Sequence, residues 1–249
     1  VRTTWEKDFN LTINYMGVYF SPNGLAGSIA NSEFMFTNDV TDGDISGGTK
    51  ADVDLAHFLA GNGGGGAAKL WSACSASKAG GYSGDSDVSD ASFIPLVAHE
   101  MAHHMGADHT WTGQDQSCTE DQYGYASGVE PGAGVSLASY AGICGTDNIP
   151  NVNKGDFHHA ESIREIVTFM RNGMGKTIDF TGAPVIYGVP GFPNFFGGGC
   201  FATQAFTNNV PVANSNPNNL TNLNIPARTP FELTGSATDP DGDMLTYQW

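Results

Sequence analysis

Three histidines and one glutamate stand at a spacing that suits metal chemistry. A short segment follows the pattern H-E-x-x-H-x-x-G-x-x-H, whose fixed positions are His99, Glu100, His103, Gly106 and His109. In a helix, His99 and His103 lie on one face about a turn apart, so both imidazoles can reach one ion. Gly106 can adopt positive φ at little steric cost and end the helix. The following turn then brings His109 round as a third ligand.

Three neutral imidazoles with one open position are typical of a catalytic zinc site and not of a structural one. Glu100 lies beside the ligands, where it can transfer protons as a general base. Five positions must agree at once, which makes coincidence a poor explanation. His104 lies one residue off the ligand face. We interpret it as a histidine of the surface or one that lies behind the ligands.

Two helices are expected to position this motif. The apolar run 93–98 leads into the first, where Pro95 fits a first-turn position better than Ser92 fits an N-cap. The second, over 153–174, is indicated by apolar residues at helical spacing. The neighbouring His158 and His159 face different ways on a helix. We therefore assign this pair to packing at the helix start and not to a second metal site.

Several strands and long loops are predicted around the helices. β-branched and aromatic residues, or short apolar runs, indicate strands at 9–20, 33–37, 53–59 and 67–74. His57 in the third strand is interpreted as a packed residue. Segments rich in Asp, Gly and Ser predict loops at 38–50, 83–92 and 110–135. In the first loop, Asp39, Asp42 and Asp44 suggest a calcium site, although a solvated turn is the simpler interpretation.

The strand at 67–74 follows a nearly pure glycine tract, 61–66, which lacks the pattern of a phosphate-binding loop. An edge strand here can bind an extended peptide through main-chain hydrogen bonds. An ordinary sheet edge behind a flexible loop is the equal alternative. The residues that would contact the peptide are Ala67, Lys69, Leu70 and Trp71.

Composition restricts the partners. The chain has 249 residues and a net charge of −16, which argues against nucleic acid and anionic membranes. No apolar run reaches membrane-spanning length, and the composition suits an extracellular protein.

Four cysteines without a C-x-x-C pair favour two disulfides. Cys118 with Cys144 is the preferred pair, because both fall between the third ligand and the next helix.

The domain organisation is expected to be a catalytic domain at 1–205, whose upper subdomain spans 1–109 and whose lower subdomain spans 110–205. An Asn- and Pro-rich linker follows at 206–230. Residues 231–249 are too few to bury a core and are interpreted as the start of a β-module. Both ends of the sequence look like cuts in a longer precursor that carries further C-terminal β-modules.

Beyond the histidine motif, the phrases 98–103, 109–111, 130–132 and 139–145 resemble secreted, reprolysin-like zinc metallopeptidases of the metzincin clan, common in Bacteroidetes-type bacteria. The resemblance covers about 9–174. It implies an α+β catalytic domain, with a twisted mixed sheet and the zinc helix above a cleft. The lower subdomain would be irregular and end in a helix. The Asp-Pro-Asp-Gly-Asp segment is similar to Ig-like or cadherin-like modules, which implies the start of a β-sandwich.

The resemblance also implies roles for the segment 136–145. Metzincins carry a methionine in a tight turn beneath the zinc, and here Ala138 stands at that position. Such a change implies a small void or a repacked floor under the site. By the same resemblance, Tyr140 would ligate zinc or steady the transition state, although a core tyrosine explains it equally. Ser139 and Gly142 would line the pocket beside the scissile bond.

The sequence therefore predicts a secreted zinc endopeptidase that hydrolyses peptide bonds with a zinc-activated water and Glu100 as general base. Its partners would be protein or peptide substrates. The alternative is a binding or adhesion protein with a catalytically weakened metzincin fold.

Overall fold

A computed structural model describes residues 5, 8, 9, 13–17, 25–62, 64–87, 92–150, 154–172, 176–178, 184–186, 209, 211–214, 224, 226–230, 232, 234–245 and 247. Its helices are α2 (Ile29–Asn38), α3 (Phe93–His104) and α4 (Ala160–Asn172), with short 3-10 helices η1 (Asp42–Asp44), η2 (Lys50–Asp52), η3 (Glu120–Gln122) and η4 (Gly145–Asp147). Its strands are β1 (Phe58–Ala60), β2 (Gly65–Ala68), β3 (Gly81–Gly84), β4 (Lys176–Ile178), β5 (Pro184–Ile186), β6 (Val212–Asn214) and β7 (Ser236–Thr238).

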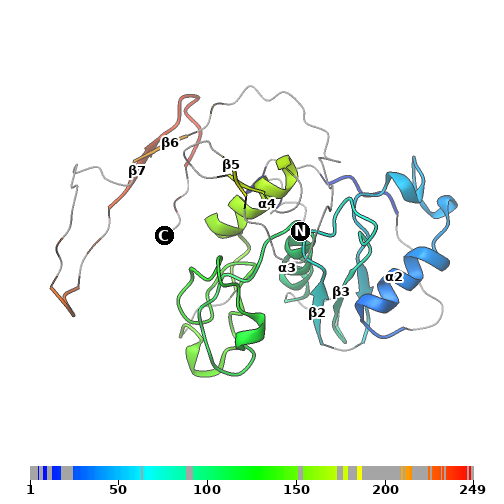
Figure 1. The fold of residues 1–249 in the computed structure, drawn as a ribbon, viewed down its shortest axis with the longest axis horizontal. Coiled ribbons are helices and arrows are strands. Elements are labelled where there is room, and N and C mark those ends of the chain that lie inside the picture. Colours follow the sequence, from blue (N-terminus) through cyan, green and yellow to red (C-terminus); the bar gives the residue numbers. More distant parts are fainter. Residues whose placement is uncertain are drawn as a thin grey trace. The chain divides into compact units, whose positions relative to one another are not determined.

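The first three strands form a mixed sheet in the order β1-β3-β2. β1 runs parallel to β3, and β2 runs antiparallel to it. α3 packs against β2 and β3, and α2 packs against β3, so the strands lie between the two helices (Figure 1). β2 is an edge strand of this sheet. The predicted α+β fold with a mixed sheet is confirmed, and the sheet is small.

α2 corrects the strand predicted at 33–37, because that whole segment is helical. The helix is fixed at both ends. Ser28 Oγ accepts a hydrogen bond from the backbone N–H of Asn31 at 3.0 Å. At the other end the Lys50 ammonium donates to the carbonyls of Phe36, Thr37 and Val40. These caps outweigh the strand preference of the aromatic residues.

The other strand predictions were only partly right. Of the strand predicted at 9–20, the described residues 13–17 carry no strand and Phe9 is helical. β1 occupies only the last residues of the apolar run 53–59 and ends one residue beyond it. β2 begins inside the glycine tract and ends at Ala68. Beyond it, positive φ at Trp71 and Cys74 turns the chain away from extended geometry.

β3 was missed, because its sequence Gly-Tyr-Ser-Gly has little strand preference. The reason for its composition is a close approach to α3. A Cβ added at Gly81 would lie 2.2 Å from Nε2 of His104. The glycine therefore lets the sheet come close to the helix that carries the histidines.

α3 and α4 share a hydrophobic core. Ala102 and Met105, from the end of α3, cluster with Ile166 and Phe169 of α4 and with the buried Trp5. The helix predicted at 153–174 is confirmed, although it begins at Ala160. His158 packs before that helix, as predicted: its backbone N–H and Nδ1–H both donate to the Asp8 carboxylate, at 2.8 and 2.9 Å.

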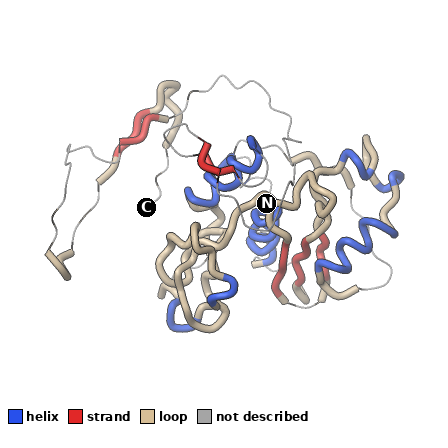
Figure 2. Tube along the Cα trace, in the orientation of Figure 1, coloured by secondary structure: helices blue, strands red, loops and turns tan. Residues whose placement is uncertain are grey.

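Between α3 and α4 the chain is mostly loop, as Figure 2 shows in tan. The predicted Cys118–Cys144 disulfide is confirmed, with a Cα–Cα distance of 5.2 Å. Cys74 is disulfide-bonded as well. Around Cys118 and Cys144, Trp111 and Ala133 form a second buried cluster. A disulfide and a small apolar cluster thus stabilise this region in place of long helices and strands.

The Glu130 side chain also holds the loop region together. Its Oε1 accepts the backbone N–H groups of Val135 and Ser136, at 2.8 and 3.1 Å. Its Oε2 accepts the hydroxyls of Thr110 and Ser136, the former at 2.5 Å. Since this carboxylate is 5 % exposed, four donors around one buried charge fix the loop strongly.

Residues 202–249 form a separate compact unit from 1–201. Its β6 and β7 pair antiparallel, so a strand lies inside the range predicted as linker. Among the described residues of this unit, these two strands are its only sheet, and a β-sandwich is not seen.

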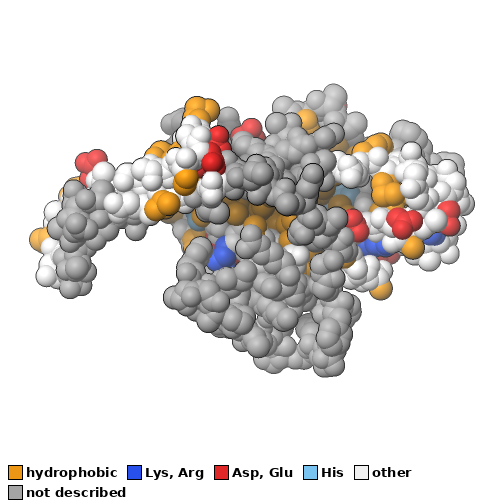
Figure 3. All heavy atoms as spheres, turned by 90° about the horizontal axis from the view of Figure 1, so that it is seen from above, with side chains coloured by type: hydrophobic (Ala, Val, Ile, Leu, Met, Phe, Trp, Pro, Cys, Tyr) orange, Lys and Arg blue, Asp and Glu red, His pale blue; other side chains and the backbone are white. Residues whose placement is uncertain are grey.

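None of the described helices is long and apolar enough to cross a membrane. On the face in Figure 3, the coloured basic groups form only small, separate spots.

Candidate metal centre

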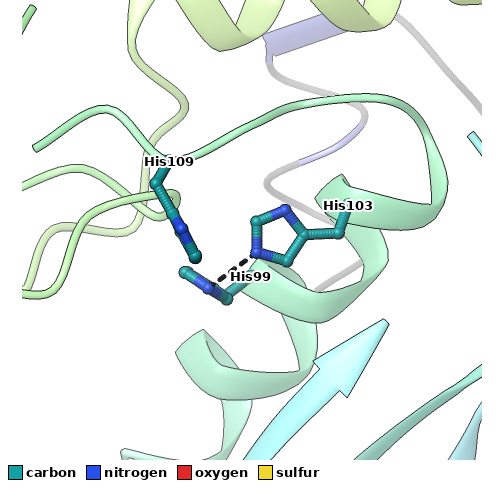
Figure 4. A group of neighbouring side chains, drawn as sticks. All are labelled: His99, His103 and His109. Atoms are coloured by element: carbon teal, nitrogen blue, oxygen red, sulfur yellow. Dashed lines mark hydrogen bonds between the residues drawn. The ribbon is translucent and has the colours of Figure 1, made fainter. Parts of the chain in front are cut away.

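Three histidine side chains converge on one point. α3 presents His99 and His103 one turn apart, and His109 reaches them from the chain after Gly106 (Figure 4). One nitrogen from each lies within 4.8 Å of the others. His99 and His103 are almost fully buried. Gly106 has φ +95°, and an added Cβ would lie 2.5 Å from the Trp71 ring, so this turn requires glycine.

Each histidine is oriented through its Nδ1 atom. His99 Nδ1 lies 2.6 Å from the Leu137 carbonyl, His103 Nδ1 2.7 Å from that of Ala107, and His109 Nδ1 2.6 Å from that of Gln122. A carbonyl oxygen only accepts, so the proton of each neutral ring is on Nδ1. All three Nε2 atoms then carry free lone pairs. This is the arrangement of histidines that ligate a metal.

The chemistry of this donor set fits a zinc ion. His99 Nε2 and His103 Nε2 are 3.0 Å apart. Two lone pairs at this distance repel each other unless a cation lies between them, and two tetrahedral zinc ligands stand about 3.3 Å apart. Burial lowers the pKa of His103 to about 3 and holds those of His99 and His109 below their usual value. The rings therefore stay neutral, the form that binds metals.

Glu100 lies beside the three rings, and its side chain is 3 % exposed. Within the described part of the chain, its Oε2 has no hydrogen-bond partner. Burial raises the pKa of this carboxyl to about 8. A buried carboxyl oxygen without a partner has a cost unless a ligand or water meets it. Glu100 can thus exchange a proton with a group bound at the cluster.

Gly66 of β2 makes room for Glu100. A Cβ added there would lie 2.6 Å from Glu100 Oε1 and 2.7 Å from the Tyr82 carbonyl. No sequence signal marks this glycine, since the tract contains several glycines and the partner comes from another element. By contrast, a Cβ at Gly64 would meet nothing within 4 Å.

A cavity of about 380 Å³ opens onto the cluster, lined by all three histidines, Glu100 and the edge strand. Of the residues predicted to contact substrate, Ala67 and Leu70 line it. Lys69 does not, and its ammonium pairs with Glu33. Trp71 packs against the α3–α4 core. Their roles toward a substrate stay predictions.

The segment beyond the third histidine contains the other predicted residues. Tyr140 lines the same cavity, its ring 4.6 Å from that of His109, and its hydroxyl donates to Gln122 at 2.7 Å. Burial raises the pKa of this phenol to about 12. Ala138 is fully buried, and its carbonyl accepts the Thr110 N–H. Neither Ser139 nor Gly142 lines the cavity: Ser139 is buried, and Gly142 turns the chain with φ +93°.

His104 is buried on the sheet side of α3 and not at the surface. Its Nε2 meets His57 Nδ1 at 3.2 Å, and His57 Nε2 bonds Ser83 Oγ at 2.9 Å. Burial lowers the pKa of His57 to about 4, so this ring is neutral too. His57 is therefore packed, as predicted. These two histidines join α3 to the sheet and stand apart from the three that converge.

Lys154 lies beside the cluster, although no sequence motif contains it. Its Nζ lies 3.4 Å from His99 Nδ1, and burial lowers its pKa to about 8. It lines a second cavity of about 370 Å³ that shares Glu100, His99 and Tyr140 with the first. A lone lysine after an ordinary loop carries no sequence signal.

Residues 14–110 match the family model described as metallo-peptidase family M12B, reprolysin-like. The match covers less than half of the chain, but it contains Glu100 and all three converging histidines. No curated protein matches the chain. Residues 14–110 therefore correspond to a reprolysin-like M12B metallopeptidase domain, in which the histidine cluster can hold the metal.

Proposed function

We propose that this chain is a zinc endopeptidase with His99, His103 and His109 as metal ligands and Glu100 as general base. The observation that carries the proposal is the shared orientation of the three rings. Each gives its Nδ1 proton to a backbone carbonyl, which leaves three Nε2 atoms around one point. The reprolysin-like match supports peptide hydrolysis as the reaction.

When bound, zinc is a Lewis acid that lowers the pKa of water and polarises a peptide carbonyl. Glu100 takes the proton of the attacking water at its unpartnered Oε2 and later gives it to the leaving amine. The raised pKa of this carboxyl suits a group that both accepts and returns a proton near neutral pH. Tyr140 can donate its hydroxyl proton as a hydrogen bond toward the developing oxyanion.

The edge strand would position the substrate. Among the described strands, β2 pairs with β3 alone, and its residues line the cavity beside Glu100. An extended peptide can pair with its free side through main-chain hydrogen bonds. Such pairing would hold a scissile bond against the histidine cluster with little demand on side-chain identity.

The deciding experiment is replacement of Glu100 by Gln in the purified chain. Zinc content, measured by plasma emission, should stay at one ion per chain, while peptide hydrolysis falls by about 10²- to 10⁴-fold. Glu120→Gln is the matched control, because Glu120 is exposed in η3 and lines neither cavity. Full activity of Glu100→Gln, or activity that resists a zinc chelator, would refute the scheme.

Ala138 favours one rival, a binding protein with a weakened catalytic site. The residue is small and fully buried in the segment whose Leu137 carbonyl orients His99. A wild-type chain that holds zinc yet leaves casein and a peptide library intact would establish this rival.

Secretion, the domain boundaries and further C-terminal β-modules belong to the proposal as well. A protein of this charge would stay dissolved outside the cell.

A further inference from the structure

A lysine ammonium lies in the second cavity beside the histidine cluster. Among the described residues that line this cavity, Lys154 is the only cation and Glu100 is the only acid. The chain as a whole has ten Lys and Arg against 26 Asp and Glu. A basic group at this position is therefore unusual for the molecule.

The ammonium has no acceptor in the part of the chain that the structure describes. Among the described residues, its one polar contact within hydrogen-bond distance is His99 Nδ1 at 3.4 Å, but that nitrogen already gives its proton to the Leu137 carbonyl. Two donors face each other there, so no hydrogen bond forms. Among the described residues, Lys154 has no ion pair within 4.0 Å, and Glu100 does not reach it. Glu130 is already bonded to four other donors.

The backbone fixes this side chain beside the cluster. The Gly155 N–H donates to the Val135 carbonyl at 2.6 Å, and the Leu137 N–H donates to the Phe157 carbonyl at 2.9 Å. The chain at 154–157 therefore runs along the segment that orients His99. Because Lys154 contacts the Nδ1 side of that ring, it lies away from the Nε2 atom that faces the other histidines.

The remaining lining suits a short acidic group. Ser117 and Thr119 offer hydroxyls, and Leu96 and Ile143 offer apolar surface. Lys154 is half-buried, and no described carboxylate pairs with its ammonium. Such an ammonium gains from a carboxylate partner that hydrogen-bonds to it. The cavity shares Glu100 and His99 with the first, so its occupant would be adjacent to the scissile bond.

We propose that Lys154 selects a substrate carboxylate in this cavity, so that the enzyme cuts next to an acidic residue or close to a free peptide C-terminus. The inference rests on the proposed peptidase function and names the substrates of that same site. Lys154 is a specificity-determining residue, and the reaction itself does not require it.

Cleavage of a mixed peptide library by the zinc-loaded full chain tests the preference. Glu or Asp should be enriched at one position beside the cut, or cuts should cluster near free C-termini. Matched peptides that carry Glu or Gln at that position, each with a free or an amidated C-terminus, then separate the two sources of the carboxylate. We expect at least a tenfold higher kcat/KM for the preferred carboxylate peptide than for its neutral partner.

Lys154→Met should abolish that ratio, so that the carboxylate peptide and its neutral partner are cut with equal kcat/KM. Arg228→Gln, which removes one positive charge from an exposed site in the second unit, should keep the ratio. Binding gives a readout without turnover. Zinc-loaded Glu100→Gln should bind the carboxylate peptide at least fivefold tighter than the neutral one in calorimetry, and adding Lys154→Met should remove the difference.

The outcomes separate the two proposals. Library cleavage without enrichment of any carboxylate, or a preference that survives in Lys154→Met, overturns this inference and leaves the peptidase standing. Absence of any cleavage by the zinc-loaded wild type, together with equal binding of the paired peptides, overturns both. If Lys154→Met fails to fold by circular dichroism, Lys154→Gln and Lys154→Arg replace it, and only Arg should retain the preference.

Discussion

The helix and the loop region supply different things to the same three histidines. α3 supplies spacing, because His99 and His103 are neighbours on one face of a helix. The loops supply orientation: the carbonyls that hold His99 and His109 belong to Leu137 and Gln122, both beyond the third histidine. Even His103 is held by Ala107, from the turn after the helix. A set of metal ligands needs both spacing and orientation, because a ring that is near but rotated does not point its lone pair at the metal ion.

The two regions are also built differently. α3 lies between a sheet and α4, and apolar contacts stabilise it. The loop region relies on a disulfide, a small aromatic cluster and the buried Glu130 carboxylate. Burial of apolar surface tolerates small changes, whereas a polar network fails when one member is lost. We therefore expect metal binding to depend on single polar residues more in the loops than in the helix.

The largest effects should come from the proposed ligands. His103→Ala removes a histidine that the helix supplies, and His109→Ala removes one that the loops supply. Each should weaken zinc binding by more than about 100-fold and reduce peptide hydrolysis to background. Zinc competition with a chromophoric chelator measures the first effect. His159→Ala, outside the cluster, should bind zinc normally. If His109→Ala held zinc as tightly as the wild type, the loops would supply no ligand, and the comparison would be wrong.

A smaller loss of kcat is expected from a change at the contact between the edge strand β2 and α3. Gly66→Ala places a methyl group 2.6 Å from Glu100 Oε1 and 2.7 Å from the Tyr82 carbonyl, so both the carboxylate and the β2–β3 backbone must shift. A displacement of this kind costs on the order of 100-fold in kcat. Zinc should remain bound, since no ligand is touched.

The same glycine tract provides the control. Gly64→Ala has open space around its added methyl group, so its kcat should be within about twofold of the wild type. Stopped-flow hydrolysis of one fluorogenic peptide compares the two variants. Equal rates for Gly66→Ala and Gly64→Ala would mean that the position of Glu100 is not limiting.

The same division explains what the sequence could predict. The convergence of the histidines was predictable because a helix converts a spacing of four into a shared face, and the turn at Gly106 was predictable because only glycine tolerates it. The second helix was found from its period. β3 was not predicted, because glycine and serine carry no strand signal. Its glycines are explained by the close packing of α3 against this strand.

The orientation of the rings could not be predicted at all. Every non-proline residue has the same backbone carbonyl, so nothing distinguishes Leu137 or Gln122 as acceptors until the loops are folded. Lys154 has the same difficulty, since its place depends on backbone pairing with residues 135–137. Among the described contacts of the loop region, the Cys118–Cys144 pair is the one that a sequence signal predicted.

In the loop region, Glu130→Gln should lower the free energy of unfolding by about 3 kcal/mol. The amide keeps the shape but loses the charge, and its NH₂ group turns a donor toward other donors. Urea unfolding of the zinc-loaded chain measures the loss. Because Leu137 lies next to the segment that Glu130 holds, zinc affinity should fall as well. Glu120→Gln, an exposed site, should change neither quantity. An unchanged zinc affinity in a destabilised Glu130→Gln would separate loop stability from ligand orientation.

The smallest effect concerns Glu165 of α4, which links the two regions by accepting the Asp108 N–H at 2.9 Å. Burial raises the pKa of this carboxyl to about 7, Glu161 and Asp108 add to the shift, and the Asp108 N–H and Arg164 oppose it. The folded chain therefore holds a proton that the unfolded chain has released, and stability falls as pH rises from about 4.5 to about 7. The expected loss is about 1 to 2 kcal/mol, after allowance for partial exposure.

Glu165→Gln tests this link, because it keeps the shape and cannot ionise. Urea unfolding at pH 5 and pH 7 should show a smaller difference between the two pH values in Glu165→Gln than in the wild type. At pH 7 the variant should equal or exceed the wild type in stability, since the cost of a buried charge is gone. If the wild type instead becomes more stable over this range and Glu165→Gln removes that gain, the ionised carboxylate is the form that holds the Asp108 N–H. The turn before His109 would then depend on charge, as the loops around Glu130 do.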